Sequence, residues 1–437
     1  MNLLRRHLQS ELHRLVNATA DPMTRHVVMV GLTDGIAFPH SAIPTQNFGF
    51  ARAQDLHHEL TSDSSKLARV VILLGALNRV DDIHTALHGV SETWKPNTRL
   101  VSISYNRIWW PIIRLMRTFT GAQPNQENWI PPKEIENLLG QADFEIVERR
   151  SALLLPISIP ILGTLVNRWL SPLPILQHLC VYNIVIGRPR FRQDKTEPSV
   201  SVIVAARNEE GNVDALVRRL PRLANRQELI FVEGGSRDDT WSAIQRMIGV
   251  GNPSGSVVSA YKQTGVGKGD AIRLGFARAT GDILVILDAD LSVPPEELPR
   301  FIHLLRTNHC EFANGSRLVY PMEKQAMQFL NLIGNRMFGV AFSFLLGQPV
   351  RDTLCGTKVL WSDDYRRIAD QRSYFGDFDP FGDFDLLFGA ARLNLKILDV
   401  PVHYKERVYG STNISRFRHG LLLLRMTAIA AKKLRFI

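Results

Sequence analysis

Cysteine is scarce in this chain of 437 residues, which contains only Cys180, Cys310 and Cys355. None of the three stands in a C-x-x-C pair. Their wide spacing excludes a disulfide framework and a cysteine zinc site, and it favours a reducing compartment. The N-terminus has no apolar signal core, so we expect no secretion signal there.

Long apolar runs are also missing, although 45% of the residues are hydrophobic. A helix needs about 20 apolar residues to cross a bilayer. The closest candidates are residues 152–166, 337–346 and 421–431, which we expect to be core or interfacial. The closing stretch 416–433 mixes basic residues with leucines and is expected to rest on an anionic membrane face. We therefore expect a cytoplasmic protein that is peripheral on the cytoplasmic face of the membrane.

The net charge is +10, which favours an anionic partner such as a nucleotide diphosphate or an anionic membrane. A merely solvated basic surface would give the same charge, and composition alone leaves both readings open. No basic run is interleaved with aromatic residues, so a nucleic-acid partner is not expected.

The length predicts two domains, because one domain usually has about 100–200 residues. A polar stretch with two prolines, residues 187–198, indicates a linker, and we place the domains at 1–190 and 191–437. Both are expected to be α/β. Strands of the first are expected at 26–30, 68–74, 100–104 and 144–147, with a helix at 83–94.

In the second domain, apolar strands at 200–205, 228–232 and 283–287 alternate with helices at 212–220, 240–248 and 271–279. This alternation predicts a three-layer domain with a parallel sheet between helices on both faces. Ligands of such sheets bind at the carboxyl ends of the strands. The polar motifs of the sequence stand at those ends.

The clearest motif is Asp288-Ala289-Asp290, which follows the strand at 283–287. Two carboxylates at this spacing can approach one Mg²⁺ or Mn²⁺ ion that bridges to a diphosphate. Such an ion would neutralise a leaving nucleoside diphosphate. The alternative is a solvated acidic turn that caps the next helix.

Three further polar loops accompany this motif. Their candidate nucleotide-sugar contacts are Ala205, Arg207, Asn208 and Glu209 after the first strand, Glu233, Ser236 and Asp238 after the second, and Lys268 and Asp270 in a glycine-rich loop. The glycines permit close backbone approach, and Lys268 with nearby N–H groups can face phosphate. The spacing is not that of a P-loop. Helix capping by Asn208, Asp238 or Asp239 is the alternative for the first two loops.

Further motifs follow at Asn314-Gly315-Ser316-Arg317, Asp352–Lys358, Phe381–Asp385 and Val400–Asn413. With these motifs, residues 199–436 resemble a family 2 glycosyltransferase of the GT-A fold, especially polyprenyl-phosphate glycosyltransferases such as dolichyl-phosphate mannosyltransferase. The resemblance implies that Asp288, Ala289 and Asp290 bind the nucleotide sugar, the two aspartates through the metal. Glu233 stands where the family commonly has aspartate, and Ser292 where it often has glutamine.

The resemblance also implies roles on the acceptor side and in catalysis. The implied acceptor contacts are Arg317, Arg336, Lys358, Arg407 and Ser411. Besides Asp290, the implied catalytic residues are Asp385 and Asp383, one of which would be the general base for a hydroxyl acceptor. A polyprenyl phosphate is already anionic and needs no base. Members of this family invert the anomeric carbon by direct displacement.

Residues from about 28 to 189 resemble a class I SAM-dependent methyltransferase, mainly in its second half. The family's glycine-rich cofactor turn is reduced here to Val30-Gly31-Leu32-Thr33-Asp34-Gly35. We therefore expect a degenerate domain that does not bind SAM. Asn78 and Asp81 are the residues to examine, although Asp81-Asp82 could simply cap the next helix.

The leading hypothesis is an inverting glycosyltransferase that moves a sugar from a UDP- or GDP-sugar to a polyprenyl phosphate or a glycan hydroxyl. One alternative is a bifunctional enzyme that both glycosylates and methylates a glycan or lipid. The other is a catalytically inactive nucleotide-binding scaffold, against which the intact aspartate motif argues.

Overall fold

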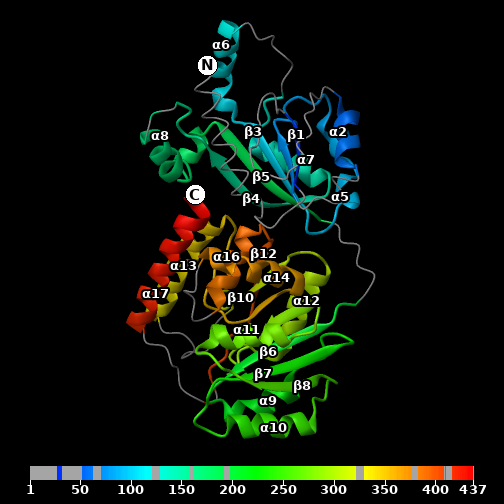
Figure 1. Cartoon of the computed structure of the whole chain (residues 1–437), viewed down its shortest axis with the longest axis vertical. Coiled ribbons are helices and arrows are strands. Elements are labelled where there is room, and N and C mark those ends of the chain that lie inside the picture. Colours follow the sequence, from blue (N-terminus) through cyan, green and yellow to red (C-terminus); the bar gives the residue numbers. More distant parts are fainter. Residues whose placement is uncertain are drawn as a thin grey trace. The chain divides into compact units, whose positions relative to one another are not determined.

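The computed structural model of the chain describes residues 27–31, 52–62, 70–120, 128–157, 159, 161–190, 197–320, 329–375, 382–407, 409 and 416–436. The chain divides into two compact units. The N-terminal unit comprises residues 1–193 with 436–437, and the C-terminal unit comprises residues 194–435. Each unit has its own sheet and its own apolar core (Figure 1).

The N-terminal unit contains a five-stranded sheet of order β1-β2-β3-β5-β4. Its strands are β1 (Val27–Gly31), β2 (Val70–Leu74), β3 (Arg99–Tyr105), β4 (Phe144–Ala152) and β5 (Tyr182–Pro189). The first three are parallel, whereas β5 runs antiparallel to both β3 and β4. The four predicted strands of this unit are confirmed, and β5 was not predicted.

The predicted linker at 187–198 is wrong at its N-terminal end, because residues 187–189 complete β5. Gly187 pairs with Leu100 and Ile146. Arg188 is fully buried, and its Nη2 lies 2.6 Å from Oε2 of Glu145. Part of the polar stretch that indicated a solvated linker is therefore internal, because Arg188 forms a buried ion pair.

Helices flank this sheet (Figure 1). They are α2 (Ala53–Leu60), α4 (Ile83–Leu87), α5 (Val90–Thr93), η1 (Arg107–Trp109), α6 (Trp110–Thr120), α7 (Pro132–Gln141), α8 (Leu162–Leu165), η2 (Val166–Leu170) and η3 (Leu176–Leu179). The predicted single helix at 83–94 is wrong, because Gly89 adopts φ +69° and separates α4 from α5. Only glycine adopts such a conformation at little cost.

The C-terminal unit contains a seven-stranded sheet of order β12-β10-β11-β9-β6-β7-β8. Its strands are β6 (Val200–Ala206), β7 (Gln227–Glu233), β8 (Val257–Lys262), β9 (Ile283–Ile286), β10 (Phe312–Ser316), β11 (Lys358–Trp361) and β12 (Ile397–Pro401). The three predicted strands are β6, β7 and β9, which are confirmed and adjacent. Their runs of apolar residues are typical of parallel strands covered on both faces.

The predicted parallel sheet contains one exception, β11. This strand is antiparallel to both of its neighbours, β9 and β10, whereas all the other pairs in the sheet are parallel. β11 has only four residues, and a short apolar segment carries no signal of its direction. The reversal brings the turn before Lys358 to the end of β9.

Helices cover both faces of this sheet, as predicted. On one face, α9 (Glu210–Arg219), α10 (Thr240–Val250) and α12 (Leu298–Arg306) share a core with Val202, Phe231 and Val285. On the other face, Ala271 of α11 (Lys268–Arg278) packs with Ile230 and Val232. The remaining helices are η4 (Pro295–Glu297), α13 (Phe329–Leu346), α14 (Ser362–Asp370), α15 (Arg372–Phe375), α16 (Asp383–Arg392), α17 (Arg416–Ala430) and η5 (Ala431–Arg435).

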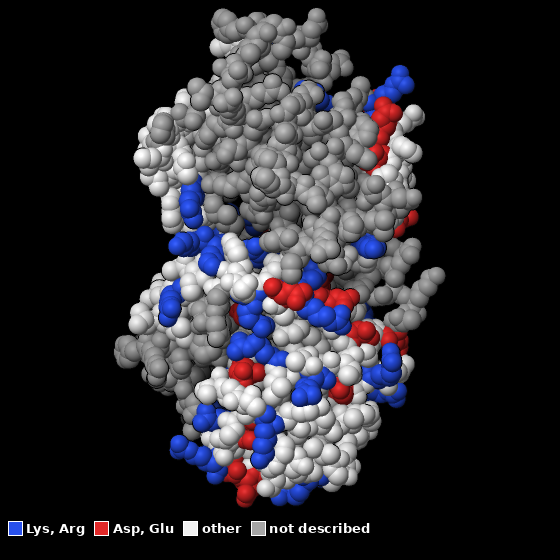
Figure 2. All heavy atoms as spheres, viewed as in Figure 1, with Lys and Arg blue, Asp and Glu red and all other residues white. Residues whose placement is uncertain are grey.

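Lys and Arg are interspersed with Asp and Glu over the face of the C-terminal unit that Figure 2 displays. On this face the net positive charge of the chain is not gathered into one uniform basic area. Within the described ranges, no helix is both long and apolar enough to cross a bilayer.

Candidate active site

Three polar loops leave the carboxyl ends of β9, β6 and β7, which are neighbours in the sheet. The loop after β6 begins at Arg207, the loop after β7 at Gly234, and the loop after β9 at Leu287. Since the strands are parallel, the loops emerge at the same edge, where α/β sheets bind ligands. The candidate nucleotide contacts Ala205 and Arg207 lie at this edge, half-buried and exposed respectively.

The loops after β6 and β7 are held together by their own hydrogen bonds. Asn208 N donates to Ser236 Oγ at 3.0 Å, and Arg237 N donates to Asn208 Oδ1 at 2.8 Å. Glu209 N donates to Thr240 Oγ1 at 2.9 Å. Asn208 therefore connects two loops and does not cap α9, whose N-cap residue is Glu209. The two loops form one preorganised rim.

The carboxyl group of Glu233 supports the turn after β7. It is buried, and its Oε1 accepts a hydrogen bond from Ser236 N at 2.5 Å. Farther along, Asp238 accepts from Thr240 N at 3.2 Å and from the hydroxyl of Tyr409 at 3.4 Å. Tyr409 was not among the predicted residues, and it comes from the segment that follows β12.

Each aspartate of the central motif is paired with a cation. Lys268 Nζ lies 2.6 Å from Asp288 Oδ1, and Arg407 Nη2 lies 2.6 Å from Asp290 Oδ2. Ser292 N donates to Asp290 Oδ1 at 2.9 Å. The sequence predicted Lys268 at the phosphates and Arg407 at the acceptor, but it did not predict that both would meet these carboxylates.

The Lys268–Asp288 pair remains ionised near neutral pH. Burial by itself would raise the pKa of Asp288, but the ammonium group of Lys268, together with Lys358 and Arg317, holds that pKa below its usual value. Burial would likewise lower the pKa of Lys268, but Asp288 and Asp383 raise it above the ordinary value. The site therefore contains carboxylates and cationic side chains next to one another, which favours an anionic ligand with a bound cation.

The glycine-rich loop before α11 is closed by Asp270. Its Oδ2 accepts hydrogen bonds from Gln263 Nε2 at 2.9 Å and from Gly265 N at 3.2 Å. Gly267 precedes the first residue of α11, Lys268. Asp270 therefore shapes the loop, and Lys268 is the residue whose charged group extends to the motif.

The turn between α13 and β11 lies directly over Asp288. A Cβ atom at Gly356 would stand 2.1 Å from Asp288 Oδ2 and 2.5 Å from Lys268 Nζ. Beside it, burial raises the pKa of the Cys355 thiol to about 12, so this cysteine is a neutral buried side chain, as expected. Only glycine leaves room for the carboxylate at this position.

The two candidate bases on α16 have different surroundings. Asp383 Oδ1 lies 3.4 Å from Nζ of Lys358, a fully buried residue whose ammonium group donates to Cys355 O at 2.6 Å. Asp385 instead pairs with Arg372 Nε at 2.6 Å. Asp383 therefore belongs to the charge cluster around Lys268, and Asp385 is engaged elsewhere.

The remaining acceptor candidates are dispersed. Arg317 binds Asp352 through two nitrogens, Nε at 2.7 Å and Nη2 at 2.8 Å, and lies 5.1 Å from the ring centre of Tyr404. Arg336 is exposed on α13. Ser411 lies outside the described residues. Arg317 is thus held in place by Asp352 and Tyr404. Of these acceptor candidates, Arg407 contacts the aspartate motif.

Glu209 lies beside this cluster with an unusual protonation. Burial, together with the charge of Asp290, raises its pKa to about 7. The hydrogen bond from Asn212 Nδ2, at 2.6 Å, lowers the pKa but does not offset this rise. From pH 4.5 to about 7 the unfolded chain loses this proton while the folded chain keeps it. The free energy of unfolding therefore falls as the pH rises through this interval.

We expect Glu209→Gln to remove this dependence. Between pH 5 and pH 8 the free energy of unfolding of the parent should fall by about 1 kcal/mol more than that of the variant, after allowance for solvent screening. Urea unfolding of both proteins in EDTA at the two pH values measures the difference. The control is Asp363→Asn, which changes an exposed aspartate. If the difference in free energy of unfolding between Glu209→Gln and the parent were the same at both pH values, Glu209 would not have the raised pKa assigned to it.

The aspartate motif fits a divalent cation by the chemistry of its donors. Asp288 and Asp290 offer hard carboxylate oxygens, which Mg²⁺ and Mn²⁺ prefer. Among the described residues, no group of three or more His, Cys, Asp or Glu side chains could hold a metal ion. Further ligands of a cation here would therefore come from a diphosphate, from water or from other oxygen groups.

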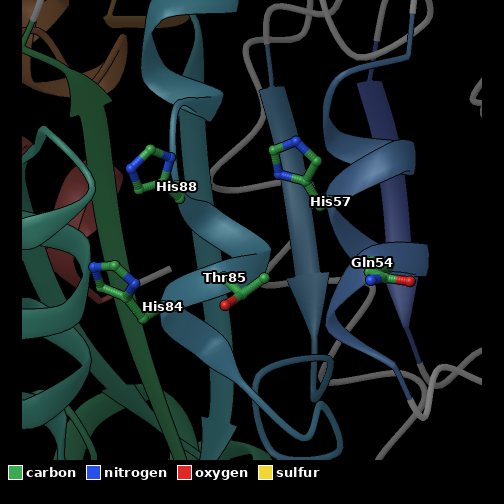
Figure 3. Close-up of a pocket in the computed structure, with 5 residues that line it drawn as sticks. All are labelled: Gln54, His57, His84, Thr85 and His88. Atoms are coloured by element: carbon green, nitrogen blue, oxygen red, sulfur yellow. The ribbon is translucent and has the colours of Figure 1, made fainter.

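A separate pocket of about 440 Å³ lies in the N-terminal unit and is lined by Gln54, His57, His84, Thr85 and His88. Figure 3 shows Gln54 and His57 on α2, His84 and Thr85 on α4, and His88 at the C-terminal end of α4. The ring centres of His84 and His88 are 5.8 Å apart. The described residues, these histidines included, contain no three-ligand metal group.

The two residues singled out in the N-terminal unit are already engaged. Asp81 Oδ1 accepts from Ala53 N, at the start of α2, at 2.6 Å. Asp82 accepts from Thr85 N at 3.2 Å and caps α4, as the alternative reading predicted. Asn78 is buried and donates to Asn128 O at 2.6 Å. These contacts stabilise helix ends and a loop.

Part of the chain is similar to known proteins. The family described as Glycosyl transferase family 2 matches residues 201–368. An undecaprenyl-phosphate 4-deoxy-4-formamido-L-arabinose transferase of Pseudomonas fluorescens (strain SBW25) is 29% identical over 226 residues, covering 50% of this chain and 61% of the relative. That of Enterobacter sp. (strain 638) is 26% identical over 225 residues, covering 50% and 63%. The chain thus spans less than two thirds of these relatives.

Among solved structures, glucosyl-3-phosphoglycerate synthase from Mycobacterium tuberculosis, in complex with Mn²⁺, UDP and glucosyl-3-phosphoglycerate, is similar. The identity is 20%, the TM-score is 0.39, and the match covers 54% of this chain and 80% of that one. The C-terminal unit is a mixed α/β domain, and its residues 201–368 match the family model described as Glycosyl transferase family 2.

Proposed function

We propose that the chain is an inverting glycosyltransferase that uses a UDP- or GDP-sugar and a polyprenyl phosphate acceptor. One observation carries the proposal. Asp288 and Asp290 lie at the carboxyl end of β9, paired with Lys268 and Arg407 and next to the rim formed by the loops after β6 and β7. This arrangement suits a nucleoside on the rim and its diphosphate at the charged pairs.

Different residues of the site are assigned to different parts of the donor. Glu233, Asn208 and Asp238 offer polar groups along the rim for the nucleoside. Asp288 and Asp290 would hold one Mg²⁺ or Mn²⁺ ion, which neutralises charge on the leaving diphosphate when it is bound. Lys268 and Arg407 place positive charge beside the same carboxylates, and we assign them to the diphosphate oxygens.

The reaction follows from the acceptor's chemistry. A phosphate oxygen of the lipid attacks the anomeric carbon, and the bond from that carbon to the diphosphate breaks, so the configuration inverts. No base is needed, because the acceptor is already ionised. For a glycan hydroxyl a carboxylate would have to take the proton. Asp383 is then the better candidate than Asp385, since it belongs to the cluster around Lys268.

The polyprenyl phosphate acceptor is supported by the relatives, whose names specify undecaprenyl-phosphate. We infer that the enzyme works peripherally on the cytoplasmic face of the membrane. Met337 and Val340 of α13 are exposed on the same helix as Arg336, and Leu421 and Leu424 are exposed on α17. Such apolar residues beside a basic residue suit contact with an anionic surface.

For the N-terminal unit we propose a degenerate methyltransferase-like domain, residues 1–190, that does not bind SAM. Three parallel strands followed by an antiparallel pair are compatible with this relationship. Asp81 and Asp82 are occupied as helix caps. Binding of SAM by the full chain would favour the bifunctional alternative.

A donor panel tests the proposed reaction. The full chain is incubated with Mn²⁺ and single UDP- or GDP-sugars, and nucleotide diphosphate release is recorded with and without a short-chain polyprenyl phosphate in detergent. We expect metal-dependent release from one donor only when the lipid phosphate is present. Release that ignores the lipid would contradict the acceptor, and an absence of turnover and of nucleotide binding would favour the inactive scaffold.

A further inference from the structure

The N-terminal unit exposes apolar residues on two segments that no part of the proposed reaction uses. The first consists of η1 and α6, and the second consists of residues 157, 159 and 161–179, which include α8, η2 and η3 (Figure 1). Their exposed large apolar residues are Ile108, Trp110, Ile112, Leu115, Ile157, Ile159, Ile161, Leu162, Leu165, Trp169, Leu170, Ile175 and Leu179. Exposed large apolar residues gathered in this number usually mark a binding site.

Hydrogen bonds join the two segments. Asn106 Nδ2 donates to His178 O at 2.8 Å and to Cys180 O at 3.0 Å, and Trp109 Nε1 donates to Leu179 O at 2.8 Å. η1, which directly precedes α6, is therefore fixed to the end of η3. The two apolar segments belong to one surface of the unit, which we call the apolar ledge.

The polarity of the second segment is inverted for a helix in water. Leu162, Leu165 and Trp169, at helical spacing, are 52%, 50% and 45% exposed. Gly163 and Asn167 are buried, and Asn167 exchanges hydrogen bonds with the backbone of Leu155 at 2.8 and 3.0 Å. Helices of soluble domains normally bury the apolar face. In this segment the buried positions are Gly163 and Asn167, and the large apolar side chains are the exposed ones.

The first segment is amphipathic with a basic face. Ile108, Ile112 and Leu115 follow the i, i+4, i+7 spacing of one helix face, and all are exposed. Arg107 and Arg114 stand one position before Ile108 and Leu115 and form the neighbouring face. Apolar and basic faces side by side are typical of helices that lie in the plane of a membrane interface.

Charge and aromatic residues identify the occupant. No acidic residue occurs from 93 to 126 or from 149 to 193, the stretches that contain the ledge. The guanidinium of Arg114 lies 5.2 Å from the ring centre of Trp110, and that of Arg168 lies 5.8 Å from Trp169. Tryptophan and arginine both favour the headgroup level of bilayers. A basic, acid-free apolar surface is complementary to anionic lipid headgroups over acyl chains.

We propose that the apolar ledge of the N-terminal unit inserts into the interface of an anionic lipid membrane. The N-terminal unit is then a membrane-binding module, in addition to the exposed residues of α13 and α17. This role goes beyond the proposed transfer reaction and does not depend on it.

Vesicle co-sedimentation of the full chain tests the proposal. The vesicles are pure phosphatidylcholine or phosphatidylcholine with roughly one third phosphatidylglycerol. We expect binding to the anionic vesicles, at least tenfold weaker in Ile112→Glu/Leu115→Glu and in Leu162→Glu/Leu165→Glu. Arg114→Gln should weaken it less. The matched control is Val250→Glu/Val257→Glu, which alters equally exposed apolar residues of the C-terminal unit and should bind like the parent.

Three results would overturn the proposal: no vesicle binding by the parent, equal binding by the ledge variants, or no preference for anionic lipid. If the parent ignores vesicles but forms a dimer that Ile112→Glu/Leu115→Glu dissociates, the ledge is a protein interface. Thermal unfolding of each variant confirms that it is folded. Nucleotide release in detergent is measured in parallel, so that failure of the transfer reaction and failure of membrane binding are told apart.

Discussion

Asp290→Asn should reduce metal-dependent nucleotide release by about 10³-fold, which corresponds to roughly 4 kcal/mol of transition-state stabilisation. The substitution keeps the size of the side chain and removes the charge that a divalent cation requires. The fold should persist, because Arg407, the partner of Asp290, has a side chain that is 30% exposed and can be solvated after the ion pair is lost. Turnover of the donor that the parent uses, measured over a range of Mn²⁺ concentrations, gives the effect.

The control for Asp290→Asn is Asp363→Asn. Asp363 is an exposed aspartate on α14 that pairs with Arg366 on the surface, and such pairs contribute little. This variant should retain the parent's rate. If Asp290→Asn turned over within tenfold of the parent at saturating Mn²⁺, the aspartate motif would not be the metal site.

Gly356→Ala should reduce turnover by about 10²-fold or more while leaving the protein folded. The added Cβ would lie 2.1 Å from Asp288 Oδ2 and 2.5 Å from Lys268 Nζ, so both side-chain ends must move. Displacing a catalytic group by about 1 Å can cost a factor of 10². Because the clash involves side-chain ends and not backbone, the melting temperature should change little. Steady-state kinetics and thermal unfolding of the same preparation measure the two effects.

Gly249→Ala is the control for the added methyl group. Gly249 lies in α10, and a Cβ there would meet nothing within 4 Å. Alanine in a helix should leave turnover unchanged and raise stability by about 0.5–1 kcal/mol. A fully active Gly356→Ala enzyme would show that the turn before β11 does not confine Asp288. If Gly356→Ala failed to fold, we would conclude that the added methyl group disturbs the core and not only the side chains of Asp288 and Lys268.

Much of the sheet was predictable because its signals are local. The strands β6, β7 and β9 are short apolar runs that end in polar residues, and each was predicted within one residue at either end. Their order and shared edge follow from the alternation of strands and helices. The reversed strand β11 was missed, because a segment of four residues, only three of them apolar, does not encode a direction.

The charge pairs of the site could not be predicted from spacing. Lys268 and Asp288 are 20 positions apart, and Arg407 reaches Asp290 from the segment after β12, so both contacts depend on the folded sheet. The choice between Asp383 and Asp385 needed the orientation of α16. Residues two apart on a helix point to opposite sides, so only one of them can face Lys268.

Calorimetric titration of the full chain with UDP and with GDP, with and without Mn²⁺, tests most directly whether the carboxyl edge of β9 is a donor site. We expect one nucleotide to bind at one site per chain, at least tenfold more tightly with Mn²⁺, and Asp290→Asn to abolish the metal's contribution. Binding of neither nucleotide to the folded chain, or binding that is equally tight without metal and in the variant, would contradict this assignment.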